Sequence, residues 1–185
     1  MIKHYISAQQ LLDDSFRLGI KVLENNYRPN FIVGVWRGGA PVAIAVQELL
    51  SYFGVKTDHF AIRTRLYTGI NEKASKVEVD GLDYLVQHLT INDRLLIVDD
   101  VFDSGQSIKQ IIQDLRSECL ENTPEIKVAT PYYKPKKNQT SRFPDYYLHE
   151  VEDWIVFPHE LDGLSPSEIL ANKPGVDALS KLLEK

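Results

Sequence analysis

The sequence predicts an α/β fold, in which a twisted, mainly parallel sheet lies between helices. One observation is the continuous apolar run Leu95–Val98, which is typical of a parallel strand that is covered on both faces. A second is the polar turn after this run, which leads into a helix whose apolar residues recur at helical spacing: Ile108, Ile111, Ile112 and Leu115. A third is an upstream strand at Phe31–Val35, which also runs through a glycine turn into a helix.

The remaining elements follow from caps and periodicity. A capping box begins at Ser7 and precedes a helix with an expected buried stripe of Leu12, Phe16, Ile20 and Leu23. The helix after the glycine turn is expected to bury Val42, Val46, Leu49, Leu50 and Phe53 and to end at Gly54. Further strands are predicted at residues 55–62 and 126–130, and Ser165 with Pro166 predicts the start of a last helix. The sequence has no internal repeat or linker, so we expect one domain, residues 1–185, with its core at about 30–160.

Three carboxylates follow the Leu95–Val98 strand, at the sheet edge where α/β proteins bind ligands. Asp99 and Asp100 can accept hydrogen bonds from vicinal sugar hydroxyls, and a metal ion would relieve their mutual repulsion. The next turn opens a helix, so its backbone N–H groups and the helix dipole can hold a phosphate dianion. Acidic residues that merely sit in a solvated loop are the alternative. A nucleotide P-loop is disfavoured because its glycine spacing and Lys-Ser/Thr ending are missing.

This segment resembles the 5-phosphoribosyl 1-pyrophosphate (PRPP) signature of the type I phosphoribosyltransferase family, in which two acidic residues precede the pattern D-[ST]-G-x-[ST]. The resemblance implies that Asp99 and Asp100 bind ribose hydroxyls and Mg²⁺, and that Asp103 lies beside the purine as the catalytic residue. The residues implied to cradle the 5′-phosphate are Asp103, Ser104, Gly105, Gln106 and Ser107. It also implies the type I phosphoribosyltransferase fold, with a small hood made from the N-terminal and C-terminal segments.

The upstream turn, Trp36-Arg37-Gly38-Gly39, has the chemistry of a second anion site. Paired glycines let backbone amides approach an anion, and the Arg37 guanidinium offers a fork of donors to phosphate oxygens. The tetrapeptide resembles the pyrophosphate loop of purine phosphoribosyltransferases, most closely that of bacterial xanthine-guanine enzymes. This implies pyrophosphate contacts from Trp36, Arg37, Gly38 and Gly39, and a cis peptide bond between Trp36 and Arg37. An ordinary turn with a surface arginine would be preferred if the motif stood alone.

The third set of candidate residues would recognise the purine base. The resemblance implies that Lys134 reaches the exocyclic oxygen, that Trp154 stacks on the ring, and that Ile155 offers backbone groups to the ring edge. A buried lysine that donates to a carbonyl oxygen would select oxopurines over aminopurines. Glu160 lies where the bacterial family usually has an aspartate that helps to bind the pyrophosphate magnesium. The alternatives are a core-filling aromatic residue for Trp154 and a solvated basic loop for Lys134.

The segment Arg63–Val79 is polar and is expected to be irregular. The resemblance implies a lid that closes over the site and excludes water, since PRPP hydrolysis competes with transfer. Tyr67 is the candidate lid residue. An ordinary solvent-exposed hairpin is the alternative.

Composition excludes several other classes of protein. The net charge of −5 and the pI near 5.5 give no general attraction to nucleic acid or anionic membranes. We expect no membrane span, no secretory signal and therefore a cytoplasmic protein. The single cysteine, Cys119, is expected to be a small core residue, and the histidines show no metal-ligand spacing.

The resemblance implies a purine salvage enzyme that transfers 5-phosphoribosyl from PRPP to hypoxanthine, guanine or xanthine, with Mg²⁺ as cofactor, and releases pyrophosphate and a nucleoside monophosphate. Which oxopurine is preferred stays open. By analogy with the family we expect a homodimer or homotetramer. One alternative is a PRPP-sensing regulator that binds nucleic acid, against which the acidic pI weighs. Another is an enzyme of the same fold that acts on a pyrimidine or a modified base.

Overall fold

The computed structural model describes residues 3–67 and 76–175 of the chain. These residues form two compact units. The larger unit is Leu12–Glu152, and the smaller combines the segment before Leu12 with the segment from Asp153 onward. No helix in the described ranges is both long and apolar enough to cross a lipid bilayer.

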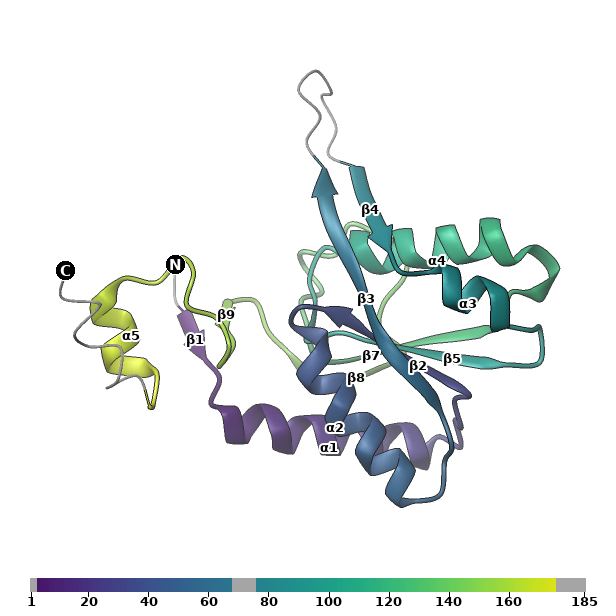
Figure 1. Ribbon diagram of the computed structural model, residues 1–185. Coiled ribbons are helices and arrows are strands. Elements are labelled where there is room, and N and C mark those ends of the chain that lie inside the picture. The colour runs from purple at the N-terminus through teal and green to yellow at the C-terminus, as the bar shows by residue number, and fades with distance from the viewer. Residues whose placement is uncertain (1–2, 68–75, 176–185) are drawn as a thin grey trace. The chain divides into compact units, whose positions relative to one another are not determined.

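The larger unit is built on a mainly parallel sheet, which confirms the predicted α/β class (Figure 1). The strand order is β4-β3-β2-β5-β7-β6, and β8 pairs with the other side of β7. Only the pairing of β3 with β4 is antiparallel among the described strands. The strands of this sheet are β2 (Phe31–Trp36), β3 (Asp58–Tyr67), β4 (Lys76–Asp80), β5 (Arg94–Val98), β6 (Val101–Phe102), β7 (Glu125–Tyr133) and β8 (Tyr146–Glu150).

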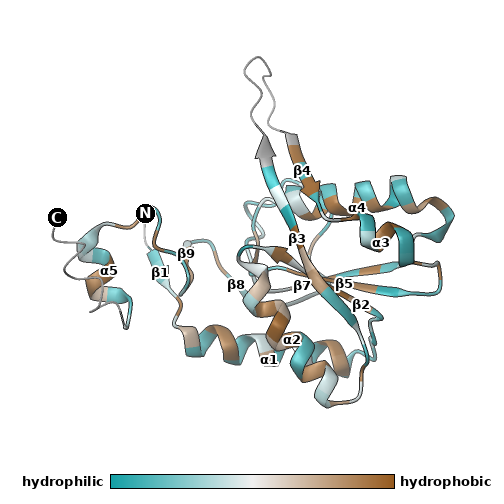
Figure 2. Cartoon of the chain, in the orientation of Figure 1, coloured by the Kyte–Doolittle hydropathy of each residue, from teal (hydrophilic) through white to brown (hydrophobic). Residues whose placement is uncertain are grey.

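Helices cover both faces of this sheet, with α1 and α2 on one side and α3 and α4 on the other (Figure 1). Their bounds are Ala8–Glu24 for α1, Gly39–Tyr52 for α2, Asp83–His88 for α3 and Gln106–Cys119 for α4, and a short 3₁₀ helix, Leu120–Asn122, follows. The central strands carry many hydrophobic residues (Figure 2), and Leu95, Leu96, Ile97 and Val98 of β5 are fully buried. Ile108, Ile111, Ile112 and Leu115 of α4 are buried as predicted, and so is Cys119.

The smaller unit joins the two ends of the described chain. Strand β1 (Lys3–Tyr5) pairs in parallel with β9 (Trp154–Val156), and α5 (Pro166–Asn172) follows. The predicted cap is confirmed, because Ser165 Oγ accepts a hydrogen bond from the Glu168 N–H at 3.3 Å. The Lys3 ammonium donates to Glu168 Oε1 at 2.6 Å and so ties the N-terminal strand to the C-terminal helix.

The predicted buried stripe of α1 is wrong. Leu12, Phe16 and Ile20 are exposed, whereas the residues that face the core are Leu11, Asp14, Ser15, Leu18 and Val22. Asp14 can face inward because it accepts a hydrogen bond from the Tyr132 hydroxyl at 3.0 Å and contacts His149 Nε2 at 3.0 Å. Phe53 was also predicted to be buried but is exposed, because α2 ends at Tyr52.

The segment Arg63–Val79 is not irregular where it is described. Its flanks form the antiparallel pair β3 and β4, so the strand that was expected to end at Ile62 continues to Tyr67. Arg65 stabilises this pairing across the strands, with its guanidinium 3.0 Å from Asp80 and 3.8 Å from Glu78. Tyr67 pairs with Lys76 at the end of the ladder, and the predicted lid beyond it, residues 68–75, lies outside the described residues.

Candidate active site

The candidate site begins at a short gap between β5 and β6, two strands that pair with the same strand, β7. Val98 of β5 pairs with Ala129, and Val101 of β6 pairs with Tyr132, so both pairs have the same offset along β7. Asp99 and Asp100 occupy the gap, opposite a stretch of β7 that includes Pro131, which has no N–H to donate. The Asp99 N–H still reaches the Ala129 carbonyl at 3.1 Å. The parallel ladder therefore opens at the two carboxylates that the sequence singles out.

The glycine turn before α2 packs directly against these carboxylates. An ideal Cβ on Gly38 would overlap Oδ2 of Asp100. A Cβ on Gly39 would lie 2.6 Å from the Val98 carbonyl oxygen and 2.9 Å from Oδ1 of Asp99. Only glycine allows such an approach of the two segments. The structure thus brings together two of the sites that were predicted from separate motifs.

The peptide bond between Trp36 and Arg37 is cis, as predicted. Both side chains are exposed at the end of β2, and Gly38 directly precedes α2, which begins at Gly39. The Ala40 N–H donates to the Arg37 carbonyl at 3.1 Å and closes the turn. The positive end of the α2 dipole and the Arg37 guanidinium are therefore close together in the chain, an arrangement that favours an anion.

The electrostatics of the acidic pair follow from their enclosure. Burial, and then the charge of Asp100, raise the pKa of Asp99 well above its usual range. The Asp100 N–H donates to Asp99 Oδ1 at 3.0 Å and fixes that carboxylate. Two adjacent carboxylates suit Mg²⁺, which takes one or two protein carboxylates and completes its shell with water and substrate oxygens.

Glu160, the third predicted metal ligand, belongs to the smaller unit. Its Oε2 accepts a hydrogen bond from the Phe157 N–H at 3.0 Å, so the carboxylate closes a local turn. Within residues 3–67 and 76–175, no three His, Cys, Asp or Glu side chains gather closely enough to hold a metal ion by themselves. A metal role for Glu160 stays a prediction.

The turn after β6 is shaped for a close backbone approach. Gly105 has a φ of +75°, and a Cβ there would lie 2.7 Å from Cε1 of Phe102. Ser104 Oγ accepts a hydrogen bond from the Gln106 N–H at 3.4 Å, and α4 begins at Gln106. Ser107 lies in the first helical turn, so the N–H groups at the start of α4 point toward this turn. The geometry is that of an anion site at a helix N-terminus.

Lys134 and Asp103 form a contact that the sequence did not predict. The ammonium of Lys134, which is 4% exposed, lies 3.2 Å from Oδ2 of Asp103, and Lys137 Nζ lies 3.9 Å from the same oxygen. The Lys134 N–H donates to the Phe102 carbonyl at 2.9 Å and holds the lysine beside the phosphate turn. Because Lys134 lies far from Asp103 in sequence, only the neighbouring positions of β6 and β7 reveal the pair.

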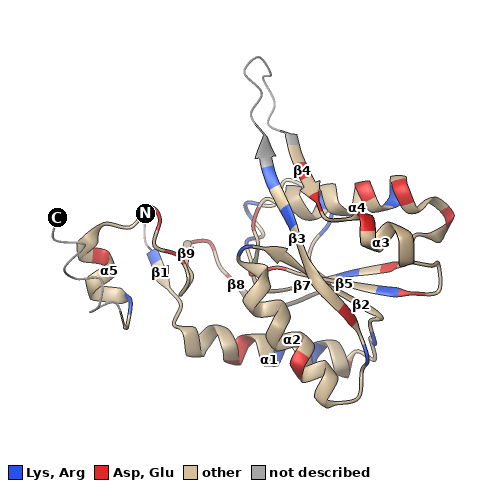
Figure 3. Ribbon diagram, in the orientation of Figure 1, with Lys and Arg blue, Asp and Glu red and all other residues tan. Residues whose placement is uncertain are grey.

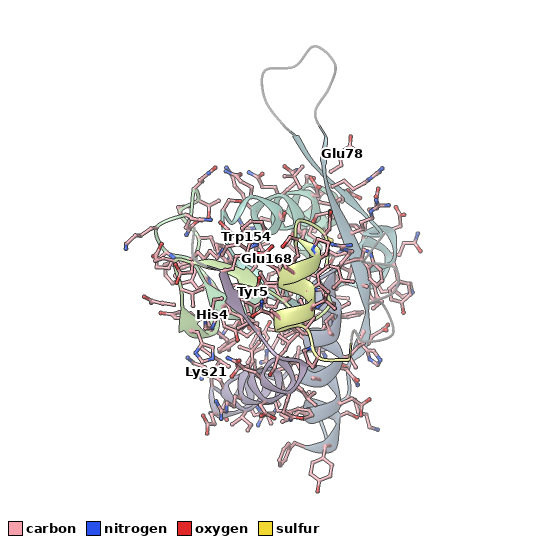
Figure 4. The ribbon with its side chains drawn as sticks, turned by 90° about the vertical axis from the view of Figure 1, so that its left-hand side faces the viewer. His4, Tyr5, Lys21, Glu78, Trp154 and Glu168 are labelled. Atoms are coloured by element: carbon pink, nitrogen blue, oxygen red, sulfur yellow. The ribbon has the colours of Figure 1, made fainter. Side chains whose placement is uncertain are left out.

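Trp154, which is labelled in Figure 4, and Ile155 lie on β9 of the smaller unit. Ile155 is buried, but the Trp154 ring is 39% exposed, so it does not fill a core as the alternative required. The Lys3 ammonium lies 5.0 Å from the centroid of that ring, and a Cβ on Gly163 would lie 3.7 Å from its Cη2. The contacts of Trp154 and Ile155 with a base stay predictions.

The fold and the site suit the class of proteins that bind phosphorylated sugars, because an acidic pair beside two glycine-containing turns offers matching chemistry. Comparison with known proteins agrees with this class. The family model "Phosphoribosyl transferase domain" matches residues 3–164, so the chain belongs to the phosphoribosyltransferase family and is a pentosyltransferase enzyme. No curated protein matches the chain significantly in sequence.

Solved structures agree with this assignment. A purine phosphoribosyltransferase from Pyrococcus horikoshii is 32% identical, with a TM-score of 0.71, over 89% of this chain and 98% of that one. The Helicobacter pylori xanthine-guanine-hypoxanthine phosphoribosyltransferase is 23% identical, with a TM-score of 0.69, over 87% and 96% of the two chains. A Neisseria gonorrhoeae protein solved with ppGpp is 19% identical, with a TM-score of 0.70, over 98% and 96%. The last two share the fold, and the first places the chain in the purine branch of the family.

Proposed function

We propose that the enzyme transfers 5-phosphoribosyl from PRPP to an oxopurine, which is hypoxanthine, guanine or xanthine. The main observation in support is the packing of Gly38 and Gly39 against Asp99 and Asp100, with the turn of residues 103–105 between β6 and α4. Pyrophosphate, ribose and 5′-phosphate are the three parts of PRPP. Each therefore has a group of matching chemistry within the larger unit.

Each group has a distinct task in the proposed reaction. The amides at Gly38 and Gly39 and the Arg37 guanidinium would stabilise the charge that develops on the departing pyrophosphate. Asp99 and Asp100 would accept hydrogen bonds from the ribose hydroxyls and hold the ring in place. The N–H groups from Ser104 to Ser107 would bind the 5′-phosphate.

We expect Asp99 and Asp100 to hold Mg²⁺ together with PRPP. When bound, the ion supplies neutralisation of the charge on the pyrophosphate and the ribose oxygens. Such a role accounts for two adjacent carboxylates at a site for an anionic substrate, since alone they would repel it. Chelation by EDTA should abolish turnover, and added Mg²⁺ should restore it.

The choice of base would depend on Lys134, Asp103 and Trp154. The buried Lys134 ammonium offers its hydrogen-bond donors, which match the exocyclic oxygen of an oxopurine and not the amino group of adenine. Asp103 lies 3.2 Å from that ammonium and would face the imidazole side of the base, where it can accept a proton or act electrostatically. Trp154 would supply a stacking face.

We further expect the enzyme to act in the cytoplasm as a homodimer or homotetramer. A mostly apolar groove of about 400 Å³ runs along α2, β2 and β3 beside Trp36, and the Ile44 side chain that lines it is 65% exposed. A second copy that covered this groove would remove it from water. Light scattering on the purified protein measures the assembly directly.

The central experiment measures pyrophosphate release from PRPP and Mg²⁺ with six bases in separate reactions: hypoxanthine, guanine, xanthine, adenine, uracil and orotate. We expect activity with oxopurines alone. The double variant Asp99→Asn/Asp100→Asn should lose it, while the control Asp83→Asn, on the exposed surface of α3, should keep it. Activity with only adenine or a pyrimidine would refute the assigned base. Absence of PRPP binding would refute the site itself.

A further inference from the structure

A second cavity is lined by none of the residues that are proposed to bind substrate. It has a volume of about 460 Å³, within the range of small-molecule sites, and it separates α4 from the segment that precedes β8. All of its lining residues belong to the larger unit: Lys109, Ile112, Gln113, Arg116, Thr140, Ser141, Arg142, Phe143 and Asp145. None of them has a task in the transfer reaction proposed above.

The cavity is positively charged, although the whole protein has a net charge of −5. Three cations and one carboxylate line it, and the guanidinium of Arg142 is already held by Asp145 at 2.9 Å and by the Ile126 carbonyl at 3.0 Å. The other two cations are Lys109 and Arg116, which are exposed and make no ion pair within the described residues. Two positive charges are therefore left for a ligand, and they would attract an anion.

The position of these two cations on α4 is regular. Lys109, Gln113 and Arg116 are four and three residues apart, so they share one face of the helix. Helix α4 carries acidic residues as well as basic ones (Figure 3), but none of its acidic residues lines the cavity. The amide of Gln113 lies between the cations in sequence and adds a neutral donor and acceptor. This face has the donors that a chain of phosphate groups requires.

An aromatic ring completes the lining. Phe143 is 65% exposed and borders the same cavity, and Ile112 adds a buried apolar surface. An exposed aromatic ring beside free cations suits a ligand that combines a flat ring with phosphate groups. We propose that this cavity is a nucleotide-binding site, separate from the substrate site, with the phosphates held by Lys109 and Arg116 and the ring against Phe143.

The cavity also shares a wall with the phosphate turn. The Gln139 N–H donates to the Ser104 carbonyl at 3.0 Å, and a Cβ on Gly105 would lie 2.8 Å from Oγ1 of Thr140. That hydroxyl is fixed in turn by Asn138 Oδ1 at 2.9 Å and by the Arg142 carbonyl at 3.0 Å. A ligand that contacts residues 140–142 would therefore shift the side chain that packs against Gly105 of the phosphate turn. We expect bound nucleotide to change the affinity for PRPP, an expectation that rests on the proposed function.

Calorimetric titration of the full chain with UTP tests the site, because a pyrimidine nucleotide avoids competition for the purine position. We expect Lys109→Ala and Arg116→Ala each to weaken UTP binding tenfold or more. The control Lys56→Ala removes the same charge from an exposed loop and should leave binding unchanged, as should Asp99→Asn/Asp100→Asn. Loss of binding only in the Asp99/Asp100 variant would place the nucleotide at the substrate site and overturn the proposal, as would absence of binding to the wild type.

The contribution of the ring is tested separately. Phe143→Ala should weaken UTP binding several-fold, while Tyr52→Ala, which removes an aromatic side chain that is 85% exposed elsewhere, should not. Inorganic triphosphate that binds as tightly as UTP would overturn the assignment of a nucleotide.

The coupling is measured as the PRPP dissociation constant with and without saturating UTP. We expect a several-fold change in the wild type and none in Lys109→Ala. If Lys109→Ala and Arg116→Ala weakened UTP binding but the wild type did not bind PRPP, the proposed function would be refuted and the cavity site would stand.

Discussion

The substitution Gly39→Ala tests the close approach of the glycine turn to the acidic pair. Its Cβ would lie 2.6 Å from the Val98 carbonyl oxygen and 2.8 Å from the Cα of Asp99. Both neighbours are backbone atoms, so the new methyl group cannot be accommodated by a side-chain rotation. Overpacking of this kind costs about 1–3 kcal/mol. We expect the free energy of unfolding of Gly39→Ala to be lower by this amount. We also expect its PRPP affinity to fall at least tenfold, because Asp99 must shift.

Gly19→Ala in α1 is the matched control. Its Cβ would also meet a close neighbour, at 3.0 Å, but that neighbour is Cδ2 of Leu49, the far end of a side chain that can rotate. Alanine in a helix interior is favoured over glycine by about 0.8–1 kcal/mol, so this variant should be neutral or more stable. Urea denaturation and calorimetric titration with PRPP measure both quantities. If Gly39→Ala matched the wild type in stability and affinity, the packing argument would be refuted.

Four further predictions concern single side chains. Asp103→Asn should lower turnover about 100-fold while changing PRPP affinity much less, and steady-state kinetics with near-native turnover would remove Asp103 from the mechanism. Trp154→Ala should raise the KM for the base about three- to tenfold, whereas an unchanged KM would exclude stacking. Because the pKa of Asp99 is raised in the folded state, its ionisation costs stability as pH rises above about 3.9, the usual value in unfolded chains. Asp99→Asn should therefore be more stable than the wild type at pH 8 and similar at pH 3, and equal denaturation midpoints at both pH values would contradict this. The hydrogen bond from Lys3, and then that from the Ser165 N–H, lower the pKa of Glu168 to about 2, so Glu168 stabilises the smaller unit above pH ~4.3 and loses this effect as pH falls toward 2. Glu168→Gln should lower the melting temperature at pH 7 but not near pH 2, and a pH-independent difference would argue against the ion pair.

The part of the site that could be predicted from sequence is local in the chain. Asp99 and Asp100 come directly after β5, and the glycine turn comes directly after β2, so strand and helix periodicity was enough to place them. The cis bond at Trp36 followed from resemblance alone, since no pattern of hydropathy encodes a peptide isomer.

The features that were missed depend on contacts between distant segments. Asp14 on α1 faces the protein core because Tyr132 and His149 bind its carboxylate. A hydropathy pattern could not predict this, since it places every aspartate toward solvent. The contact between Asp103 and Lys134 arises only when β6 and β7 lie side by side. A sequence pattern reports whether each residue prefers burial or solvent, whereas each of these contacts depends on a partner far along the chain.

The shared register of β5 and β6 gives the acidic gap a fixed length. Strands alternate the direction of their side chains at every residue, so one inserted or deleted residue between Val98 and Val101 would turn the buried Phe102 to the opposite face of the sheet. The turn that follows, and with it the start of α4, would be displaced as well. We therefore expect insertions and deletions in surface connections, such as the one between α3 and β5. We expect none at Asp99 and Asp100.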